Sequence, residues 1–189
     1  MRHKLGTRTG LFIGAVICWI TAFLILIQAG LPQRADYSGY IVSGDVRVAP
    51  EIGASAPPFD LKNLVGESLR LDELRGTPVI LNFWATWCEP CRVEMPELEA
   101  LYQTYRAKGL RIVAINLGDT AADVGQWVDD YGLSFDIALD PQQMTGAIYQ
   151  LRGQPSPFVI SPDGMITHIV YGPATMSGLE AAIAPFFPA

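Results

Sequence analysis

The hydrophobic pattern divides the 189-residue chain into parts of different character. An uncharged apolar run from Leu11 to Leu31 is long enough to cross a bilayer as a helix, which takes about 20 residues. The next stretch, Pro32–Pro58, is rich in Gly, Pro, Ser and Ala and has no sustained period. The pattern therefore predicts an N-terminal segment (1–10), one transmembrane anchor (11–31), a flexible tether (32–55) and a folded domain (56–189).

Strand patterns recur through the domain. Polar and apolar positions alternate in "FDLKNLVGESLRLDELRG", which predicts a hairpin turning at Val65–Gly66, followed by a short helical turn. The continuous apolar runs Pro78–Trp84 and Leu110–Gly118 are typical of strands that are buried on both faces. "FDIALD" predicts a short strand, and "PFVIS" and "MITHIVYG", joined by "PDG", predict an antiparallel hairpin.

Helical patterns lie between these strands. The first has apolar residues on one side, namely Val93, Leu98, Leu101 and Tyr105. Four helices are expected: Glu89–Ala107, a second from Thr120 or Ala121 to Tyr131 that stops at Gly132, Pro141–Leu151, and a last one capped by Ser177 and reaching Phe187. The alternation with a final hairpin predicts an α/β fold in which helices flank a mixed central sheet.

Charge is distributed unevenly along the chain. Of 13 basic and 19 acidic residues, three basic and no acidic ones precede Leu31, which leaves 10 basic and 19 acidic residues in the remainder. Because positive flanks stay in the cytoplasm, the N-terminus is expected inside the cell and the domain outside it. The acidic remainder argues against binding to nucleic acid or to an anionic membrane surface.

A cleaved signal peptide is the alternative to an anchor. Its apolar region would be about 7–15 residues long and would end in small residues. The observed run is longer, and Ile27 would occupy the −3 position of a cleavage site. An uncleaved anchor is therefore favoured, with Cys18 as a small apolar residue within it.

The segment "FWATWCEPCRVEMPELE" holds two of the three cysteines. Cys88 falls where a strand has ended and a helix begins, so its thiolate meets free N–H groups and the positive end of the helix dipole. This position favours the thiolate, which is the attacking species. Cys91 lies one turn further in and is expected to resolve the mixed disulfide. Pro90 restricts the loop, and the charge of Glu89 disfavours the thiolate.

Glu94 lies three residues after Cys91 and therefore on the same face of the helix. A half-buried carboxyl at this position has a raised pKa and can pass protons to Cys91 during exchange. The alternative is a solvated glutamate that only complements the helix dipole. Spacing alone leaves both readings open.

Other uses of the cysteine pair are weaker. A structural disulfide closing so short a loop restricts the unfolded chain only slightly. Zinc takes four ligands, and within the domain only His168 is a natural third. A dithiol that carries Cu(I) is a further alternative, because soft thiolates select that ion. The helix-start context favours redox chemistry.

A second site segment is "LRGQPSPFVI", where a proline stands just before a buried strand. Pro155 is a candidate for a cis peptide bond, with Pro157 as its rival. A cis bond at Pro155 would leave the N–H and C=O of Gln154 free to pair with a bound peptide.

The motif "NFWATWCEPCRVEMPEL" resembles the active-site segment of membrane-anchored thioredoxin-like thiol-disulfide oxidoreductases of the TlpA/ResA/DsbE type, in the redoxin family. "APPFDL" at the start of the domain and "GDT" after the second buried strand also fit that type. The resemblance covers Ala56–Phe187. It implies a thioredoxin-like fold with an N-terminal hairpin and a β/α insertion ahead of Pro155.

The resemblance also implies residue roles. Cys88 matches the nucleophile, Cys91 the resolving cysteine, Glu94 the active-site glutamate and Pro155 the cis-proline. The residues expected to contact a client are Trp87, Glu89, Pro90, Gln154 and Pro155. No cofactor and no metal is expected beyond the redox-active Cys88–Cys91 disulfide.

The function implied is that of a reductase of disulfides in secreted or membrane proteins, for example in cytochrome c maturation. Its expected partners are disulfide-containing clients and a membrane electron donor of thiol-disulfide type. The alternatives are a disulfide oxidase, a peroxiredoxin-like antioxidant and a copper metallochaperone or binding module. The direction of electron transfer distinguishes a reductase from a disulfide oxidase.

Overall fold

The computed structural model describes residues 18, 19, 21, 40–42 and 46–187, which belong to two units, 1–39 and 40–189. In the first unit Cys18, Trp19 and Thr21 are helical, and the Thr21 hydroxyl donates to the Cys18 carbonyl. The rest of the expected anchor, Leu11–Leu31, lies outside the described residues. Within the described part of the chain, no helix is long and apolar enough to cross a membrane.

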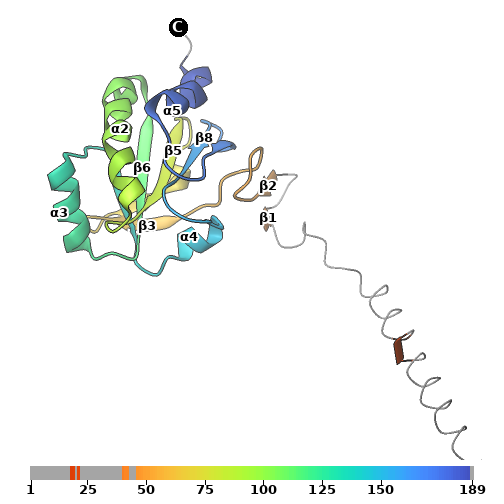
Figure 1. Ribbon diagram of the computed structural model, residues 1–189. Coiled ribbons are helices and arrows are strands. Elements are labelled where there is room, and N and C mark those ends of the chain that lie inside the picture. The colour runs from red at the N-terminus through yellow and green to blue at the C-terminus, as the bar shows by residue number, and fades with distance from the viewer. Residues whose placement is uncertain (1–17, 20, 22–39, 43–45, 188–189) are drawn as a thin grey trace, which may run out of the picture. The chain divides into compact units, whose positions relative to one another are not determined.

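A seven-stranded mixed sheet forms the centre of the second unit (Figure 1), with the strand order β4-β3-β7-β6-β5-β8-β9. Strands β5, β6 and β7 run parallel, and the other neighbours pair antiparallel. The mixed sheet and both predicted hairpins are confirmed. The strands are β3 (Asp60–Asn63), β4 (Ser68–Arg70), β5 (Val79–Trp84), β6 (Arg111–Leu117), β7 (Asp136–Asp140), β8 (Ser156–Ile160) and β9 (Ile166–Ile169).

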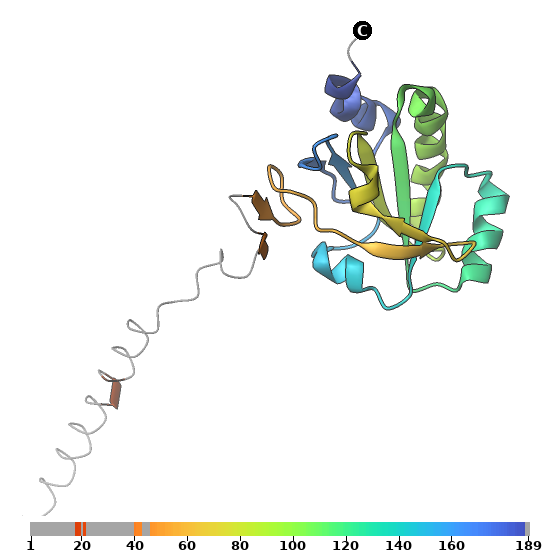
Figure 2. The same ribbon diagram turned by 180° about the vertical axis from the view of Figure 1, so that it is seen from behind.

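Helices cover both faces of the sheet, as Figures 1 and 2 show from opposite sides. Helices α2, α3 and α5 pack on one face, while η2 and the segment after α4 pack on the other. The segment between α2 and Pro155 forms β6, α3, β7 and α4, as expected of the β/α insertion. The helices are η2 (Leu71–Leu74), α2 (Glu89–Tyr105), η3 (Arg106–Lys108), α3 (Ala121–Tyr131), α4 (Met144–Ile148), α5 (Met176–Ile183) and η4 (Ala184–Phe186).

Strand β5 explains why two layers form. Alternate side chains of a strand point to opposite faces of the sheet. Because both faces are covered here, all six residues of β5 are buried. Ile80 and Trp84 belong to the core beneath α2, whereas Leu81 and Phe83 belong to the core on the other side. The strand therefore ends, with Cys88 shortly after it, in the middle of a sheet that is covered on both faces.

The expected start of the domain at Ala56 is too late. Val48, Ala49, Ala54 and Ser55, which were assigned to the tether, are buried. The backbone of Gly53 and Ala54 pairs with Ile166 of β9, with N–H···O distances of 2.8 and 2.9 Å. Small residues let this segment lie close against the sheet edge. Strand β2 (Val46–Val48) pairs with β1 (Tyr40–Val42) in a separate two-stranded sheet.

Three helix expectations also need correction. Helix α4 has only five residues and begins at Met144, because the Asp140 carboxylate caps it by accepting from the Met144 and Gly146 N–H groups at 3.0 Å. Helix α5 is capped by Thr175 and not by Ser177. On α2, Val93 is exposed, and buried Met95 takes the place expected for it.

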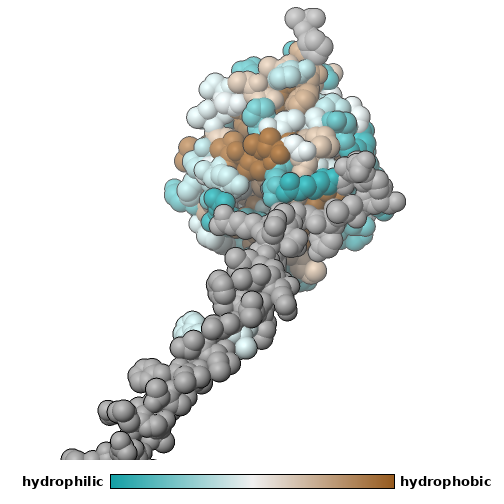
Figure 3. Space-filling view, turned by 90° about the vertical axis from the view of Figure 1, so that its right-hand side faces the viewer, coloured by the Kyte–Doolittle hydropathy of each residue, from teal (hydrophilic) through white to brown (hydrophobic). Residues whose placement is uncertain are grey.

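Large apolar side chains are exposed at few described positions. Figure 3 shows an apolar patch near the middle of the face in view, with polar residues beside it. The exposed ones in the second unit are Ile52, Val65, Trp87, Val93, Met144, Ile148 and Tyr171. Three of these, Trp87, Val93 and Tyr171, come from segments at or next to the cysteine pair or Pro155.

Candidate active site

Cys88 and Cys91 form a disulfide at the start of α2. Cys88 is the N-cap residue, and its sulfur accepts a hydrogen bond from the Cys91 N–H at 3.3 Å. The predicted helix-start position of the pair is therefore confirmed. Cys88 is 5% exposed and Cys91 is fully buried, so an approaching sulfur meets Cys88 first. The same N–H that contacts the Cys88 sulfur in the disulfide can stabilise its thiolate.

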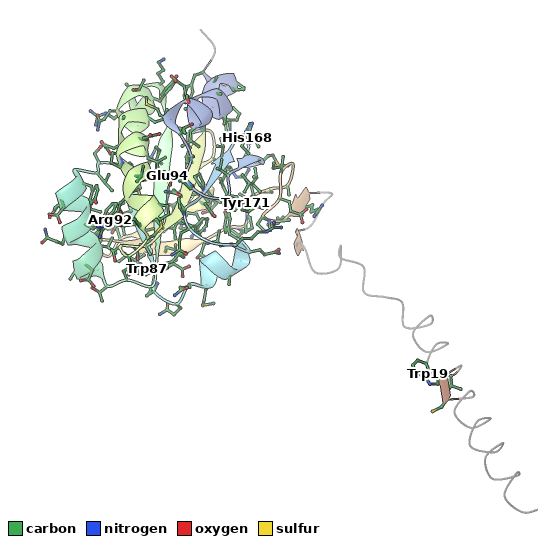
Figure 4. The ribbon with its side chains drawn as sticks, in the orientation of Figure 1. Trp19, Trp87, Arg92, Glu94, His168 and Tyr171 are labelled. Atoms are coloured by element: carbon green, nitrogen blue, oxygen red, sulfur yellow. A yellow bond between two sulfur atoms is a disulfide. The ribbon has the colours of Figure 1, made fainter. Side chains whose placement is uncertain are left out.

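The residues around the pair present a mixed surface. Trp87 is 71% exposed, and Glu89 and Pro90 are exposed as well. The Arg92 Nε atom lies 3.7 Å from a carboxylate oxygen of Glu89, so a positive charge accompanies the negative one beside Cys88. Figure 4 shows Trp87 and Arg92 near the N-terminal end of α2. Trp87, Glu89 and Pro90, which are expected to contact a client, are therefore exposed, while the disulfide itself stays largely covered.

Glu94 is almost completely buried, at 1% exposure, and is therefore more deeply placed than the half-buried position expected. One carboxylate oxygen accepts from the Asn82 side-chain amide and the other from the Ala174 N–H, both at 2.7 Å. Burial raises the pKa of Glu94 to about 7, although the two hydrogen bonds lower it. The charge of Glu97 raises it slightly further. A solvated helix residue is thereby excluded.

Asn82 was missed by the sequence reasoning. It lies on β5 and is fully buried, and its side-chain oxygen has no hydrogen-bond partner. An amide offers a donor and an acceptor, so rotation by half a turn would aim the oxygen at Glu94. One orientation serves the ionised carboxylate, and the other accepts from the protonated acid. The signal was available, because Asn82 is the single polar residue in the buried run "VILNFW".

The peptide bond between Gln154 and Pro155 is cis, which settles the choice between the two prolines. Pro157 instead lies within β8, opposite Asn82 of β5. Strand β8 begins at Ser156 opposite Phe83, so the Gln154–Pro155 segment lies at the end of the sheet from which the chain leaves β5 towards Cys88. The Gln154 N–H and C=O have no hydrogen-bond partner among the described residues.

The loop before α5 ties the two halves of the site together. The Gly172 N–H donates to the Pro155 carbonyl at 3.0 Å, and two residues later the Ala174 N–H donates to Glu94. The Met176 N–H donates to Glu97 at 2.6 Å. Two carboxylates of α2 therefore hold the loop that contacts Pro155.

Asp119, from the "GDT" segment, supports the loop ahead of the cysteines. Its carboxylate accepts from the Thr86 N–H at 2.7 Å and from the Asn116 side-chain amide at 2.8 Å. The Asn116 side-chain oxygen in turn accepts from the Asp119 N–H at 3.1 Å. Asp119 is thus a positioning residue that joins the end of β6 to the chain two residues before Cys88.

The structure does not bring His168 to the cysteines. His168 lies on β9 and is exposed, and Figure 4 shows it far from Trp87, which directly precedes Cys88. Among the described residues, no group of three or more His, Cys, Asp or Glu side chains is arranged to hold a metal ion.

The site combines a Cys-Glu-Pro-Cys pair at a helix start, a buried glutamate one turn after Cys91 and a cis-proline that opens the neighbouring strand. On a mixed sheet covered by helices, these features define a thioredoxin-like thiol-disulfide oxidoreductase. The model of the AhpC/TSA family matches residues 52–169. The chain belongs to this family and is of the TlpA/ResA/DsbE type.

Similar proteins agree with this assignment. A thiol-disulfide oxidoreductase ResA of Oceanobacillus iheyensis is 38% identical over 141 residues, which cover 72% of this chain and 73% of the relative. A ResA of Bacillus thuringiensis is 34% identical over 165 residues, covering 87% and 94%. A crystal structure from Chlorobium tepidum, described as a thiol:disulfide interchange protein DsbE, superposes with a TM-score of 0.68 at 31% identity, covering 71% and 96%.

Proposed function

We propose that this oxidoreductase works as a reductase of disulfides in secreted or membrane proteins. The observation that carries the proposal is the placement of Glu94, a carboxyl with a pKa near neutral, beneath the resolving cysteine. A group of this kind can take the proton that Cys91 must lose before it attacks. The same transfer runs in reverse when the protein disulfide is attacked from outside, so the direction of electron flow is tested by the reduction potential of the couple.

The first step uses the reduced protein. The Cys88 thiolate attacks one sulfur of the client disulfide, the client S–S bond breaks, and one client sulfur leaves as a thiolate. The product is a mixed disulfide between Cys88 and the client. The free N–H and C=O of Gln154 hold the client backbone in extended form beside Cys88, and Trp87 provides an exposed apolar contact.

The second step releases the client. Cys91 passes its proton to ionised Glu94, and the resulting thiolate attacks the Cys88 sulfur. The Cys88–Cys91 bond forms, the mixed disulfide breaks, and the second client sulfur leaves as a thiolate. Two electrons have then moved from the protein to the client. Glu94 holds one proton, which it returns when the pair is reduced again by a donor dithiol.

The proposed setting is outside the cytoplasm, with Leu11–Leu31 as an uncleaved anchor and the N-terminus inside. The basic residues ahead of the apolar run support this orientation. Surroundings outside the cytoplasm oxidise thiols, so a reductase there needs a continual supply of electrons from a membrane donor of thiol-disulfide type. Apocytochrome c, whose cysteines must be reduced before haem attaches, is a proposed client.

The reduction potential of the Cys88–Cys91 couple tests the direction. The full-length protein is equilibrated with glutathione or dithiothreitol buffers, and its free thiols are counted by alkylation. A potential near that of thioredoxin, about −270 mV, supports a reductase. A potential near −120 mV, as in a strong oxidant, would refute the proposal in favour of an oxidase.

A further inference from the structure

Arg152 and Tyr171 form an exposed pair next to the proposed client-binding segment. The Arg152 guanidinium carbon lies 5.0 Å from the centre of the Tyr171 ring, a distance typical of a cation–π contact. Arg152 is exposed, and Tyr171 is 58% exposed. Figure 4 shows Tyr171 among the strands above α4 in that view. Both side chains therefore reach solvent at the surface.

The backbone ties this pair to Pro155. Arg152 stands two residues before Gln154, whose N–H and C=O are free of partners in the described structure. Tyr171 directly precedes Gly172, whose N–H donates to the Pro155 carbonyl at 3.0 Å. A client strand that pairs with Gln154 must consequently pass close to both side chains.

Arg152 carries an uncompensated charge. It makes no salt bridge within the part of the chain that the structure describes. It is also the single charged residue in the two segments at this edge, 149–157 and 169–175. The protein as a whole has a net charge of −6. A lone cation at the binding edge of an acidic protein is complementary to an acidic partner and not to a basic one.

The contact with Tyr171 leaves guanidinium N–H groups available for a ligand. A guanidinium has five N–H donors, and a cation–π contact with one ring does not use all of them. Those N–H groups match a carboxylate, which can accept two of them at once. Stacking on Tyr171 also restricts the Arg152 side chain, so less freedom is lost when a carboxylate binds.

We propose that Arg152, held by Tyr171, selects clients that carry an aspartate or glutamate near the cysteine that is attacked. The inference rests on the proposed function, because it concerns the client of the same site. It names the client by chemistry: an extended disulfide-bearing segment with a carboxylate placed to meet Arg152. Arg152 precedes Gln154 at one end of the segment that is proposed to pair with the client, so the preference should depend on which side of the client cysteine the carboxylate stands.

The test uses disulfide-linked dimers of an unstructured peptide with Glu, Gln or Lys at the second residue before the cysteine, and a second set with the change after it. The reduced full-length protein gives two electrons to each peptide disulfide, which releases two peptide thiols that are counted over time. Dithiothreitol serves as the reference reductant. The rate at which the protein reduces a given peptide is divided by the rate at which dithiothreitol reduces the same peptide. This removes the effect of the peptide charge on its own sulfur.

We expect the Glu peptide of one set to react about two- to fivefold faster than its Gln counterpart, the range of exposed ion pairs. Arg152→Gln should abolish the preference. Tyr171→Phe, which keeps the ring, should retain it, and Tyr171→Ala should weaken it. Arg106→Gln is the control, because it makes the same charge change just beyond the C-terminal end of α2. That 17-residue helix is about 25 Å long and has the cysteine pair at its other end, so this variant should leave the preference intact.

Two results would overturn the inference. Equal normalised rates for Glu and Gln peptides in both sets would show that Arg152 does not read a carboxylate, with the reductase itself intact. A preference that persists in Arg152→Gln would assign it to another group. If no peptide disulfide is reduced at all, the proposed function fails and this inference fails with it.

Discussion

Replacing Glu94 by glutamine should make the protein more stable relative to the parent as the pH rises. Burial raises the pKa of Glu94 from 4.5 in the exposed state to about 7 in the folded protein. Between these values the folded protein holds a proton that the unfolded chain has lost. The free energy of unfolding of the parent therefore falls as the pH rises from 4.5 to 7, and is level above that range.

The size of the effect follows from the shift. Each pKa unit corresponds to 1.36 kcal/mol, so the parent loses about 3 kcal/mol of stability across this range through Glu94 alone. Glutamine has no proton to lose and keeps the shape of the side chain. The variant can still accept from the Ala174 N–H, and rotation of the Asn82 amide provides an acceptor for its NH₂ group.

Urea unfolding of the oxidised proteins at several pH values from 4.5 to 7.5 measures the difference. The oxidised form is chosen because disulfide-bonded cysteines do not titrate. The unfolding free energy of Glu94→Gln minus that of the parent should rise by about 3 kcal/mol. Glu89→Gln, which removes an exposed carboxylate from the same helix, provides the baseline. A difference that stays flat across the range would refute the raised pKa and remove the proposed proton carrier.

Three further predictions follow from the site. Cys91→Ala should accumulate mixed disulfides with clients and Cys88→Ala should not, as non-reducing gels of cell extracts would reveal; equal trapping by both would contradict their assigned roles. Asp119→Ala should lower the unfolding free energy by about 1–3 kcal/mol, because the Thr86 N–H loses its acceptor. Asp119→Asn keeps an acceptor and should lower it less. Urea titration measures both variants, and equal losses of stability would count against this hydrogen bond. A cysteine introduced in the Pro32–Gly39 stretch should react with an impermeant thiol reagent on intact cells, and protection until lysis would overturn the outward orientation.

The central elements could be predicted because their signals are local. A largely apolar run such as Val79–Trp84 is typical of a strand covered on both faces. Helix α3 has a capping Thr120 at its start and Gly132 in the left-handed conformation at its end. The position of the cysteine pair could be predicted as well, because the helix that follows Cys88 begins where the strand pattern stops.

The remainder depends on contacts that no local pattern records. Ala174 binds Glu94 across 80 residues, and Gly53 pairs with Ile166 across an even longer gap in the sequence. A stretch rich in small residues looks like a linker until a sheet edge is there to receive it. Helix α4 begins at Met144, where the carboxylate of Asp140 in the preceding strand accepts from its first turn, whereas Pro141 suggests an earlier start.

The surroundings of Glu94 balance two opposed requirements. Burial without hydrogen bonds would keep the carboxyl protonated through the physiological range, and it could then accept no proton from Cys91. Too many hydrogen-bond donors would instead hold the carboxylate ionised, and it would then have no proton to return to Cys91. The bonds from Asn82 and Ala174 offset part of the burial and leave the pKa near 7, where both transfers are accessible. Because Ala174 belongs to the loop that also binds Pro155 through Gly172, the carboxyl proposed to carry the proton also holds the edge proposed to bind the client. A truncation such as Glu94→Ala, which also removes the acceptor for the Ala174 N–H, should therefore disturb proton transfer and client alignment together.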